Sequence, residues 1–343
     1  MKVLVAGGMG YIGSHTCVEL LNKGYEVVIA DNLSNSNINV LDSIKEITEK
    51  YVSFEMVNLA NAQEAQNLFE KHHDIDAVIN FAASKAVGES VNMPLMYYNN
   101  NLNILLNLLA GMDRWDIRHF VQSSSCTVYG ESDTLPINES CPVKPALSPY
   151  GNTKKIAEDI LFDISKVTAM NTICLRYFNP IGAHESALIG EYPNGVPNNL
   201  MPFITQTAIG KRDTLSVFGK DYNTHDGTCI RDYIHVVDLA LSHITSLERL
   251  LKKKNKKKFE IFNIGTGNGF SVLNVIKSFE KTSGLKLKYQ FVERRAGDVE
   301  RIWADTTLAN TELGWKAKKA LDEMTLSAWK WELQLNEKNY DKQ

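Results

Sequence analysis

The sequence of 343 residues has few cysteines, and they follow no pattern. Its five cysteines are odd in number, widely scattered and without a CxxC pair: Cys17, Cys126, Cys141, Cys174 and Cys229. Such scattered cysteines are typical of reduced thiols and argue against a disulfide framework or a zinc site. The eight histidines form no HExxH pattern either, so no metal is expected.

Net charge and long apolar runs are also scarce. The formal net charge is −3, from 37 Lys and Arg against 40 Asp and Glu, which gives no electrostatic reason to bind nucleic acid or an anionic membrane. No apolar run approaches the roughly 18 residues that a membrane-spanning helix needs. The start, MKVLVAGGMG, is too short in apolar residues for a signal peptide. We therefore expect a cytoplasmic protein with neither a nucleic-acid nor a membrane partner.

What the sequence does contain is an alternation of short apolar strands with helical patterns. Strands are predicted at 3–6, 25–30, 77–81, 120–123 and 172–177, and helices at 12–22, 62–71, 95–112 and 150–166. Strands that alternate with helices predict an α/β fold, a doubly wound (Rossmann) parallel sheet covered on both faces.

The composition and the secondary-structure pattern of the sequence change after Asn179. Residues 181–200 are rich in Gly, Pro and Asn, and this loop is long enough to be functional. Regular patterns return at 236–250, 259–264, 271–283 and 306–313. We predict a nucleotide-binding domain over 1–180 and a smaller mixed α/β domain over 181–343. Segments within about 231–265 are open to either domain.

A glycine-rich turn, Gly7-Gly8-Met9-Gly10-Tyr11-Ile12-Gly13, follows the first strand and opens the first helix. Gly7 can take the positive φ of a tight turn, Gly10 lets a pyrophosphate approach the backbone, and Gly13 lets the helix pack closely on the sheet. The free N–H groups of the first helical turn would face the phosphates. Asp31 ends the second strand, where it can accept hydrogen bonds from ribose hydroxyls, and no arginine follows within 32–39. The turn therefore predicts NAD in preference to NADP, with a purely structural turn as the alternative.

Tyr150 and Lys154 lie four residues apart, just after Ser148-Pro149. Serine followed by proline marks a helix start, and residues i and i+4 share one helical face, so the phenol and the ammonium point into the same space. A phenol holds its proton to about pH 10, and a nearby lysine and a positive nicotinamide would both lower the pKa of Tyr150. The strand that ends in serines 123–125 can supply a hydroxyl to the same substrate oxygen.

Together these features resemble the extended short-chain dehydrogenase/reductases, and nearly the whole chain is similar to the UDP-glucose 4-epimerase family. The resemblance is carried by GGMGYIGSHTCVELL from Gly7, KAVGES at 85–90, SSSCTVYG at 123–130, SPYGNTK at 148–154, LRYFNPIGAH at 175–184, PNNLMPF at 197–203, FGKDYNTHDGTCIRDYIHVVDLA at 218–240 and WADTT from Trp303. The 218–240 segment is the most specific, because a generic dinucleotide fold does not need it.

The resemblance implies interconversion of UDP-glucose and UDP-galactose with a tightly bound NAD. Tyr150, as phenolate, would take the proton from the sugar 4-hydroxyl. Ser125 would share the O4 hydrogen bond, and Lys154 would also hold the nicotinamide ribose. The C4 hydride would pass to NAD, the 4-keto sugar would present its opposite face, and the returning hydride would invert C4.

The resemblance also implies two sets of binding residues. NAD would contact Gly7, Gly10, Tyr11, Ile12, Gly13, Asp31, Asn32, Asn58, Leu59, Phe81, Ala82, Lys85, Asn100, Ser123, Tyr150, Lys154 and Phe178. The UDP-sugar would contact Lys85, Ser125, Tyr150, Asn179, Asn199, Leu200, Phe218, Arg231, Tyr233, Arg295 and Asp298. Two arginines suit a diphosphate because guanidinium groups are permanently charged and bidentate. The alternative for Arg231 and Arg295 is ion pairing with Asp232 or Asp298.

Three positions depart from the family pattern. Asn58 stands where the family usually has Asp near the adenine, and Ala83-Ser84 replaces a Gly-containing pair before Lys85, so the local loop could shift. Ile302 stands where some members place a tyrosine beside the sugar. The smaller residue leaves more room near C2, and we hypothesise that UDP-GlcNAc and UDP-GalNAc are additional substrates.

Two other functions stay open at this point. A sugar-nucleotide 4,6-dehydratase of the same superfamily would need Asp-Glu directly after the active hydroxyl residue, but Cys126 and Thr127 stand there. A catalytically silent NAD-sensing regulator should have lost Tyr150 or Lys154, and both are present.

Apolar residues at helical spacing indicate a partner. Tyr98, Leu102, Leu105 and Leu109 are spaced 4, 3, 4, and the next helix continues the pattern with Ala157, Leu161 and Ile164. One face of each helix must pack on the sheet. The family resemblance implies that a remaining apolar face pairs two subunits in a four-helix bundle, so a homodimer is predicted.

Overall fold

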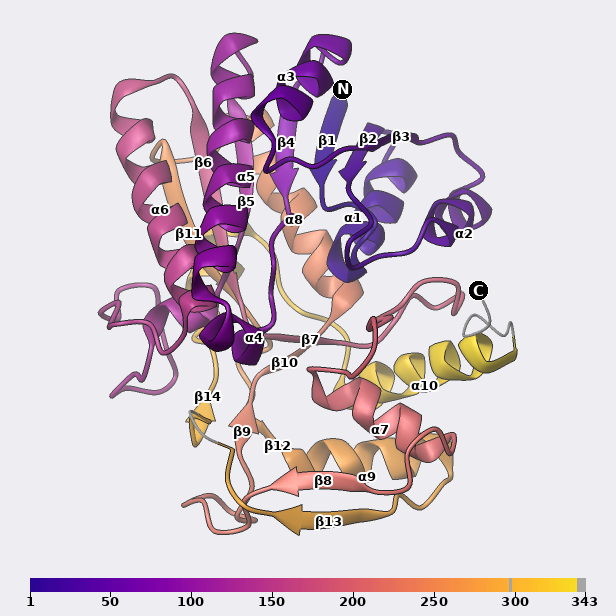
Figure 1. The fold of residues 1–343 in the computed structure, drawn as a ribbon. Coiled ribbons are helices and arrows are strands. Elements are labelled where there is room, and N and C mark those ends of the chain that lie inside the picture. The colour runs from indigo at the N-terminus through magenta and orange to yellow at the C-terminus, as the bar shows by residue number, and fades with distance from the viewer. Residues whose placement is uncertain (296–297, 338–343) are drawn as a thin grey trace.

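The computed structural model describes residues 1–295 and 298–337 (Figure 1). Its elements in chain order are β1 (Lys2–Ala6), α1 (Tyr11–Asn22), β2 (Glu26–Asp31), α2 (Asn39–Thr48), β3 (Ser53–Met56), α3 (Ala62–Lys71), β4 (Ala77–Asn80), α4 (Val87–Asn92), α5 (Pro94–Arg114), β5 (His119–Ser125), a 3-10 turn (Cys126–Tyr129), α6 (Pro149–Val167), β6 (Asn171–Tyr177), β7 (Asn179–Ile181), α7 (Leu200–Ala208), β8 (Leu215–Phe218), β9 (Ile230–Arg231), β10 (Tyr233–His235), α8 (Val236–Leu251), β11 (Phe259–Ile264), β12 (Phe270–Ser271), α9 (Val272–Ser283), β13 (Tyr289–Val292), β14 (Arg301–Ile302), a π-helical turn (Ala309–Leu313) and α10 (Leu321–Glu337).

Seven parallel strands form the main sheet, in the order β11-β6-β5-β4-β1-β2-β3. β1 lies between β2 and β4, with Ala6 paired to Ala30 on one side and to Asn80 on the other. The strand order therefore reverses at β1. Ligands of such sheets bind outside the carboxyl ends of the strands at this reversal. The predicted doubly wound α/β fold is confirmed.

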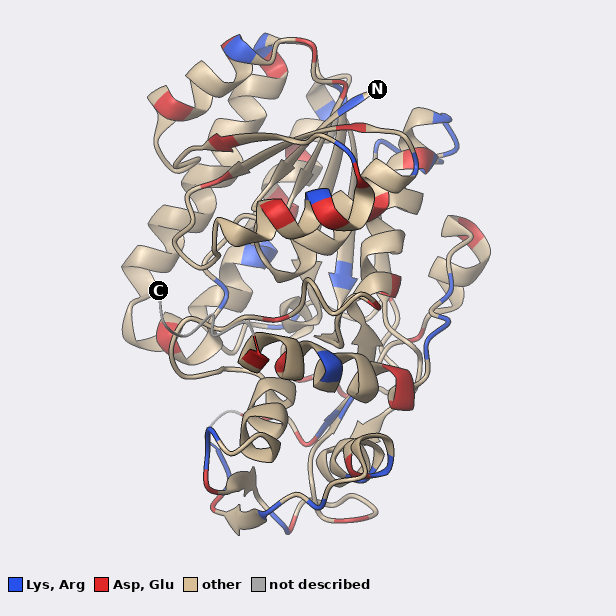
Figure 2. Cartoon of the chain, turned by 90° about the vertical axis from the view of Figure 1, so that its right-hand side faces the viewer, with Lys and Arg blue, Asp and Glu red and all other residues tan. Residues whose placement is uncertain are grey.

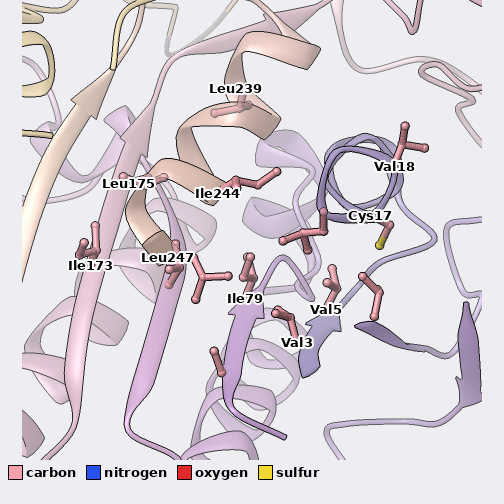
Figure 3. Close-up of a cluster of buried hydrophobic side chains, with 14 of the residues drawn as sticks. Val3, Val5, Cys17, Val18, Ile79, Ile173, Leu175, Leu239, Ile244 and Leu247 are labelled. Carbon is pink, nitrogen blue, oxygen red and sulfur yellow. The ribbon is translucent and has the colours of Figure 1, made fainter. Parts of the chain in front are cut away.

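Helices cover both faces of this sheet. On one face, α1 and α8 pack against the strands through a cluster that includes Val5, Leu175 and Leu247 (Figure 3). On the other face, α3, α5 and α6 pack through a second cluster that includes Leu108 and Leu161. Because both faces are buried, the strands are nearly continuous apolar runs, which is why they were visible in the sequence.

A second lobe lies at the carboxyl ends of the strands (Figure 1). In it, α7, α9 and α10 surround a third apolar cluster with Met201, Phe279 and Met324. The short strands of this lobe form the pair β8-β13 and the three-stranded β12-β9-β14. Residues 236–264 do not stay in this lobe, because α8 packs against α1 and β11 pairs with β6 at the edge of the main sheet.

The surface carries both signs of charge. Basic and acidic residues are interspersed over the view in Figure 2. Among the described residues, no helix has the length and apolar character to span a bilayer.

Most predicted elements agree with the structure to within one or two residues, and 62–71 and 259–264 match α3 and β11 fully. The helix predicted over 306–313 matches a helical turn over 307–313, whose last five residues, Ala309–Leu313, are π-helical before Gly314 ends it at φ +73°. The pattern missed α10 entirely. That helix packs against both α7 and α9, so its apolar residues are not confined to one stripe.

Two helical glycines allow the packing of the helical layer to be tested. A Cβ on Gly111 of α5 would lie 2.1 Å from the fully buried ring of Phe69, whereas a Cβ on Gly88 of α4 would meet nothing within 4 Å. We expect Gly111→Ala to lower the free energy of unfolding by about 1–3 kcal/mol through overpacking. The control Gly88→Ala should be neutral or stabilising by up to about 1 kcal/mol. Urea titrations of both variants at equal protein concentration check this, and equal stability of the two would contradict it.

Candidate active site

The glycine-rich turn joins β1 to α1 at the point where the strand order reverses. Gly7 has φ +74°, and a Cβ there would lie 2.7 Å from the Ala82 amide nitrogen. A Cβ on Gly13 would lie 2.2 Å from the Gly7 carbonyl oxygen. Both glycines are therefore required by the turn itself. At Gly10 the only atom within 4 Å of a Cβ is the Gly7 oxygen at 3.3 Å, so the outer side of the turn is open to a ligand.

The groups around this turn fit a dinucleotide. No side chain caps the N-terminus of α1, so the amides of Tyr11 and Ile12 keep their N–H groups for a phosphate. The Asp31 carboxylate accepts from the Met9 amide at 3.0 Å through Oδ2 and from the Leu33 amide at 2.9 Å through Oδ1. Each carboxylate oxygen has about two acceptor sites, so Oδ2 can still accept a ribose hydroxyl.

The next strand ends bring further predicted residues to the same edge. Asn32 and Asn58 are exposed, and each accepts a backbone amide two residues on, from Ser34 and from Ala60, both at 3.1 Å. Leu59 is buried, and its carbonyl accepts a hydrogen bond from Asn107 Nδ2 of α5 at 2.9 Å. The amide of Asn58 thus shapes its own turn and leaves its NH₂ group available.

The loop after β4 is tied to α5. The Ser84 amide donates to Asn101 Oδ1 at 2.8 Å, and Asn100 Nδ2 donates to Ser84 Oγ at 3.0 Å. These bonds fix the Ala83-Ser84 departure in one conformation. Phe81, at the start of this loop, packs on the buried ring of His243 with centroids 4.6 Å apart. Ala82 and the exposed Lys85 complete the loop.

The proposed catalytic side chains meet where β5 ends and α6 begins. Ser148 caps α6, its Oγ accepting the Gly151 amide at 3.1 Å, so the helix starts at Pro149 and carries Tyr150 in its first turn. Tyr150, Lys154 and Ser125 are all buried. The Ser125 hydroxyl hydrogen-bonds the Tyr150 phenol. Lys154 Nζ lies 5.8 Å from the centre of the Tyr150 ring and donates to the Ser123 carbonyl at 2.8 Å.

The electrostatics of this pair differ from the expectation. Burial raises the pKa of Tyr150, and the nearby Tyr177 and Cys126 act in the same direction. The hydrogen bond from Ser125 acts in the opposite direction but does not outweigh them. Burial also lowers the pKa of Lys154 to about 8. The prediction that the neighbouring lysine lowers the pKa of Tyr150 is therefore wrong for the chain by itself, because Lys154 donates to Ser123 and not to the phenol.

The predicted arginines meet on the second lobe. Arg231 Nη2 lies 3.5 Å and Arg295 Nη2 2.6 Å from Oδ1 of Asp298. The ion-pair alternative is therefore realised with Asp298, but not with Asp232, whose carboxylate accepts from Thr266 and from the Gly267 and Ala304 amides. Two guanidinium groups share one carboxylate, which leaves a local positive charge that suits a diphosphate.

The remaining predicted residues lie on β7 and β10, at the start of α7, and at the end of β8 near Arg295. Asn179 pairs with Tyr233 between β7 and β10, and the burial of Tyr233 raises its pKa to about 12. Asn199, directly before Leu200 at the start of α7, donates its Nδ2 to Glu191. The Arg295 guanidinium lies 6.0 Å from the centre of the Phe218 ring.

An apolar cluster includes Cys126, the residue that directly follows β5. Phe178, the residue after β6, packs in it with Cys126 and Ile302, and all three are buried. Ile302 is the residue that departs from the family tyrosine. It belongs to the same apolar cluster as Cys126, the residue that follows Ser125 in the sequence.

Sequence reasoning missed two residues of this site. Tyr177, the last residue of β6, shares a 2.6 Å hydrogen bond with Ser123 Oγ, and burial raises its pKa to about 12. The sequence contained enough information to find Tyr177. It ends the predicted strand 172–177, and parallel pairing with the strand that ends in serines 123–125 places it beside them. Glu191 approaches Lys85 from the second lobe, and burial raises its pKa. It lies inside the loop predicted to be functional, but nothing in the pattern singled it out.

The chain is similar to known proteins over nearly its whole length. The family model described as GDP-mannose 4,6 dehydratase matches residues 4–327. The UDP-glucose 4-epimerase of Bacillus subtilis is 50% identical over 97% of this chain and 97% of its own length. The crystal structure of UDP-glucose-4-epimerase from Stenotrophomonas maltophila with bound NAD and formylated UDP-arabinopyranose has a TM-score of 0.95 at 44% identity, covering 98% of this chain and 99% of that chain. The Bifidobacterium longum UDP-glucose 4-epimerase in complex with NAD+ and UDP has a TM-score of 0.93 at 43% identity, with 97% and 98% covered.

Two glycine substitutions separate the structural role of the turn from its ligand role. We expect Gly13→Ala to lower the free energy of unfolding by about 1–3 kcal/mol, because the Gly7 carbonyl must move. Gly10→Ala should leave that free energy within about 0.5 kcal/mol of wild type but weaken NAD binding at least about tenfold, because its Cβ stands where the pyrophosphate approaches. Denaturant titration and calorimetric NAD titration check the two effects, and wild-type NAD affinity in Gly10→Ala would refute the ligand role.

Proposed function

The chain belongs to the family of the GDP-mannose 4,6 dehydratase model and, within it, to the UDP-glucose 4-epimerases, and from this premise we propose that it interconverts UDP-glucose and UDP-galactose by reversible oxidation at C4. It is an NAD-dependent isomerase. The observation that carries the proposal is the meeting of Tyr150, Ser125 and Lys154 in one buried site, with the Arg231 charge close enough to act on Cys126, the residue after Ser125.

The cofactor is NAD, which supplies a hydride acceptor and donor when it is bound. The turn from Gly7 to Gly13 and the free amides at the start of α1 hold its diphosphate, and Asp31 accepts from its adenosine ribose. The rest of the cofactor site is formed by side chains at the carboxyl ends of the next strands: Asn32, Asn58, Leu59, Phe81, Ala82, Lys85, Asn100, Ser123, Phe178, and the catalytic Tyr150 and Lys154.

The chain's own residues perform the proton transfer. Tyr150 takes the proton of the sugar 4-hydroxyl and returns one after the 4-keto sugar has presented its other face. Ser125, already hydrogen-bonded to the phenol, orients the same oxygen. Lys154, fixed on the Ser123 carbonyl, places its positive charge beside the ring and lies where it can also hold the nicotinamide ribose. Because burial raises the pKa of Tyr150, the phenolate depends on positive charge that arrives with the cofactor.

The UDP-sugar is held mainly from the second lobe. Arg231 and Arg295 bind the diphosphate, and Asp298 keeps both guanidinium groups in place. The nucleoside and sugar contacts come from Lys85, Asn179, Asn199, Leu200, Phe218 and Tyr233. The proposed division is a cofactor domain over 1–180, to which 236–264 return, and a substrate domain over the other residues to 343. Of the substrate domain, 296–297 and 338–343 lie outside the described residues. We propose the cytoplasm as the location, since all five cysteines are free thiols.

The two alternatives are not favoured. A dehydratase needs an acid and a base directly after the hydroxyl residue, but burial raises the pKa of Cys126 to about 12, and Thr127 has no carboxylate. A silent NAD-sensing regulator has no use for a Tyr–Ser–Lys arrangement buried at the edge of the cofactor site.

Tyr150→Phe tests the mechanism. Removing the phenol should reduce epimerisation at least about 100-fold, because the general base is lost, while NAD stays bound. Product analysis from UDP-galactose without added NAD, together with the NAD content of the denatured protein, checks both statements. Retained wild-type turnover in this variant would end the mechanistic proposal.

The substrate range follows from Ile302. We propose that UDP-GlcNAc and UDP-GalNAc are also substrates, because Ile302 is buried in the apolar cluster next to Phe178 and carries no ring or hydroxyl. Wild-type protein should convert UDP-GlcNAc at a measurable rate. Ile302→Tyr should reduce that rate at least about tenfold and change UDP-galactose turnover by less than about threefold, since only the N-acetyl group needs the space. No conversion of UDP-GlcNAc by wild type, with rapid conversion of UDP-galactose, would refute this range.

We also propose a homodimer formed by α5 and α6. Leu105 and Leu109 of the predicted stripe are buried on the sheet, so they are not the partner face. Exposed apolar residues remain beside them, with Leu106 47% and Phe162 48% exposed.

Sedimentation at micromolar concentration should give the mass of two chains. Leu106→Glu should shift it toward one chain, while Tyr51→Glu, at an exposed residue outside these helices, should not. A wild-type mass of one chain would refute the dimer.

A further inference from the structure

A buried ion pair lies one helical turn below Lys154. Glu158 of α6 and Arg176 of β6 are 6% and 3% exposed. Arg176 Nε donates to Glu158 Oε1 at 3.0 Å, and Nη2 donates to Oε2 at 2.5 Å. Such a pair requires full hydrogen bonding to offset the desolvation of both charges, and replacing it by apolar residues often costs nothing in stability. Its presence beside the catalytic helix therefore needs a reason other than stability.

Ser124 fixes the pair to the catalytic strand. Its hydroxyl, fully buried, donates to Glu158 Oε1 at 2.5 Å. Ser124 pairs with Arg176 across β5 and β6, so the strand register holds both partners of the carboxylate. The residues on either side of Ser124 are Ser123, whose carbonyl accepts from Lys154, and Ser125, which bonds the Tyr150 phenol. Three successive residues of β5, Ser123, Ser124 and Ser125, thus make polar contacts that dock α6 on the end of this strand.

The carboxylate also faces the lysine. Lys154 and Glu158 are i and i+4 on α6, and both side chains turn inward toward β5. The negative charge of Glu158 opposes the burial that lowers the pKa of Lys154. Cys174 acts in the same direction, but burial raises the pKa of its thiol, so it stays neutral. The other titratable groups around the Tyr150–Lys154 pair are Tyr97 on α5, Cys126 after β5, and Arg176 and Tyr177 on β6.

We propose that Glu158 is a positioning residue for catalysis: held by Arg176 and Ser124, it keeps Lys154 charged and docks α6 so that Lys154 and Tyr150 stay in register with the serines of β5. The inference rests on the proposed function, since it assigns a role to a residue that acts through Lys154. Arg176 provides the anchor, and its guanidinium also stacks 4.6 Å from the centre of the Tyr129 ring.

The test replaces the pair by apolar residues, Glu158→Leu with Arg176→Met, and measures kcat against pH. Without the carboxylate the pKa of Lys154 falls, so the ammonium is lost at a lower pH. The alkaline limb of the profile should move down by about one pH unit, with kcat at pH 8 reduced about fivefold. If this variant does not fold, Glu158→Gln with Arg176→Met keeps an acceptor for Ser124 without the charge and should show the same shift.

The chain offers a matched control. Arg249 of α8 and Glu260 of β11 form a second buried pair, with Nε to Oε2 at 2.7 Å and Nη2 to Oε1 at 3.0 Å. Arg249→Met with Glu260→Leu removes the same chemistry away from α6 and should leave kcat and its pH profile unchanged within twofold.

The outcomes separate the two proposals. If wild type epimerises UDP-galactose and Tyr150→Phe does not, but the folded Glu158 variants keep the wild-type alkaline limb, the positioning role is overturned and the function stands. A loss of kcat with an unmoved limb has the same meaning, because a purely structural defect would not change a titration. If wild type does not epimerise UDP-galactose, the proposed function itself has failed.

Discussion

The register between β5 and β6 is the constraint on which the rest of the active site depends. Parallel pairing sets Ser124 beside Arg176 and Ser125 beside Tyr177. Because successive side chains of a strand point to opposite faces, Ser124 and Arg176 face α6, while Ser123, Ser125 and Tyr177 face the side covered by α8. A slip of one residue would exchange these two sets and would separate the serine hydroxyl from the Tyr150 phenol.

The two faces of this strand pair have different roles. On one face the ion pair of Glu158 and Arg176 fastens α6 to the sheet. At the strand end, the buried hydroxyl groups of Ser123 and Ser125 lie beside Tyr177 and the first turn of α6. The reversal of strand order at β1 brings the glycine turn to the same edge, and the second lobe lies across from it. The site is thus a consequence of topology, because the carboxyl ends of the parallel strands meet the first turns of α1 and α6 at one edge of the sheet.

Burial decides the chemistry of the site as much as contact does. Taken out of water, Tyr150 is a poor acid and Lys154 a weaker base than usual, with a pKa of about 8. Each departs from its ordinary value in the direction that disfavours its charge. In the proposed mechanism the phenolate depends on positive charge nearby, which the bound oxidised cofactor would supply.

Sequence alone determined much of the architecture and supplied the residues that we propose as reacting groups. The strands of the main sheet were legible because both faces are buried, and the glycine turn, Asp31, Tyr150 and Lys154 were legible because local spacing defines them. The tertiary structure alone decided what depends on contacts between distant segments. It decided that α8 and β11 return to the main sheet, that Leu105 and Leu109 face the core, and that Arg231 and Arg295 share Asp298. It also decided that burial raises the pKa of Tyr150, since desolvation depends on what packs around a group and leaves no mark in residue spacing.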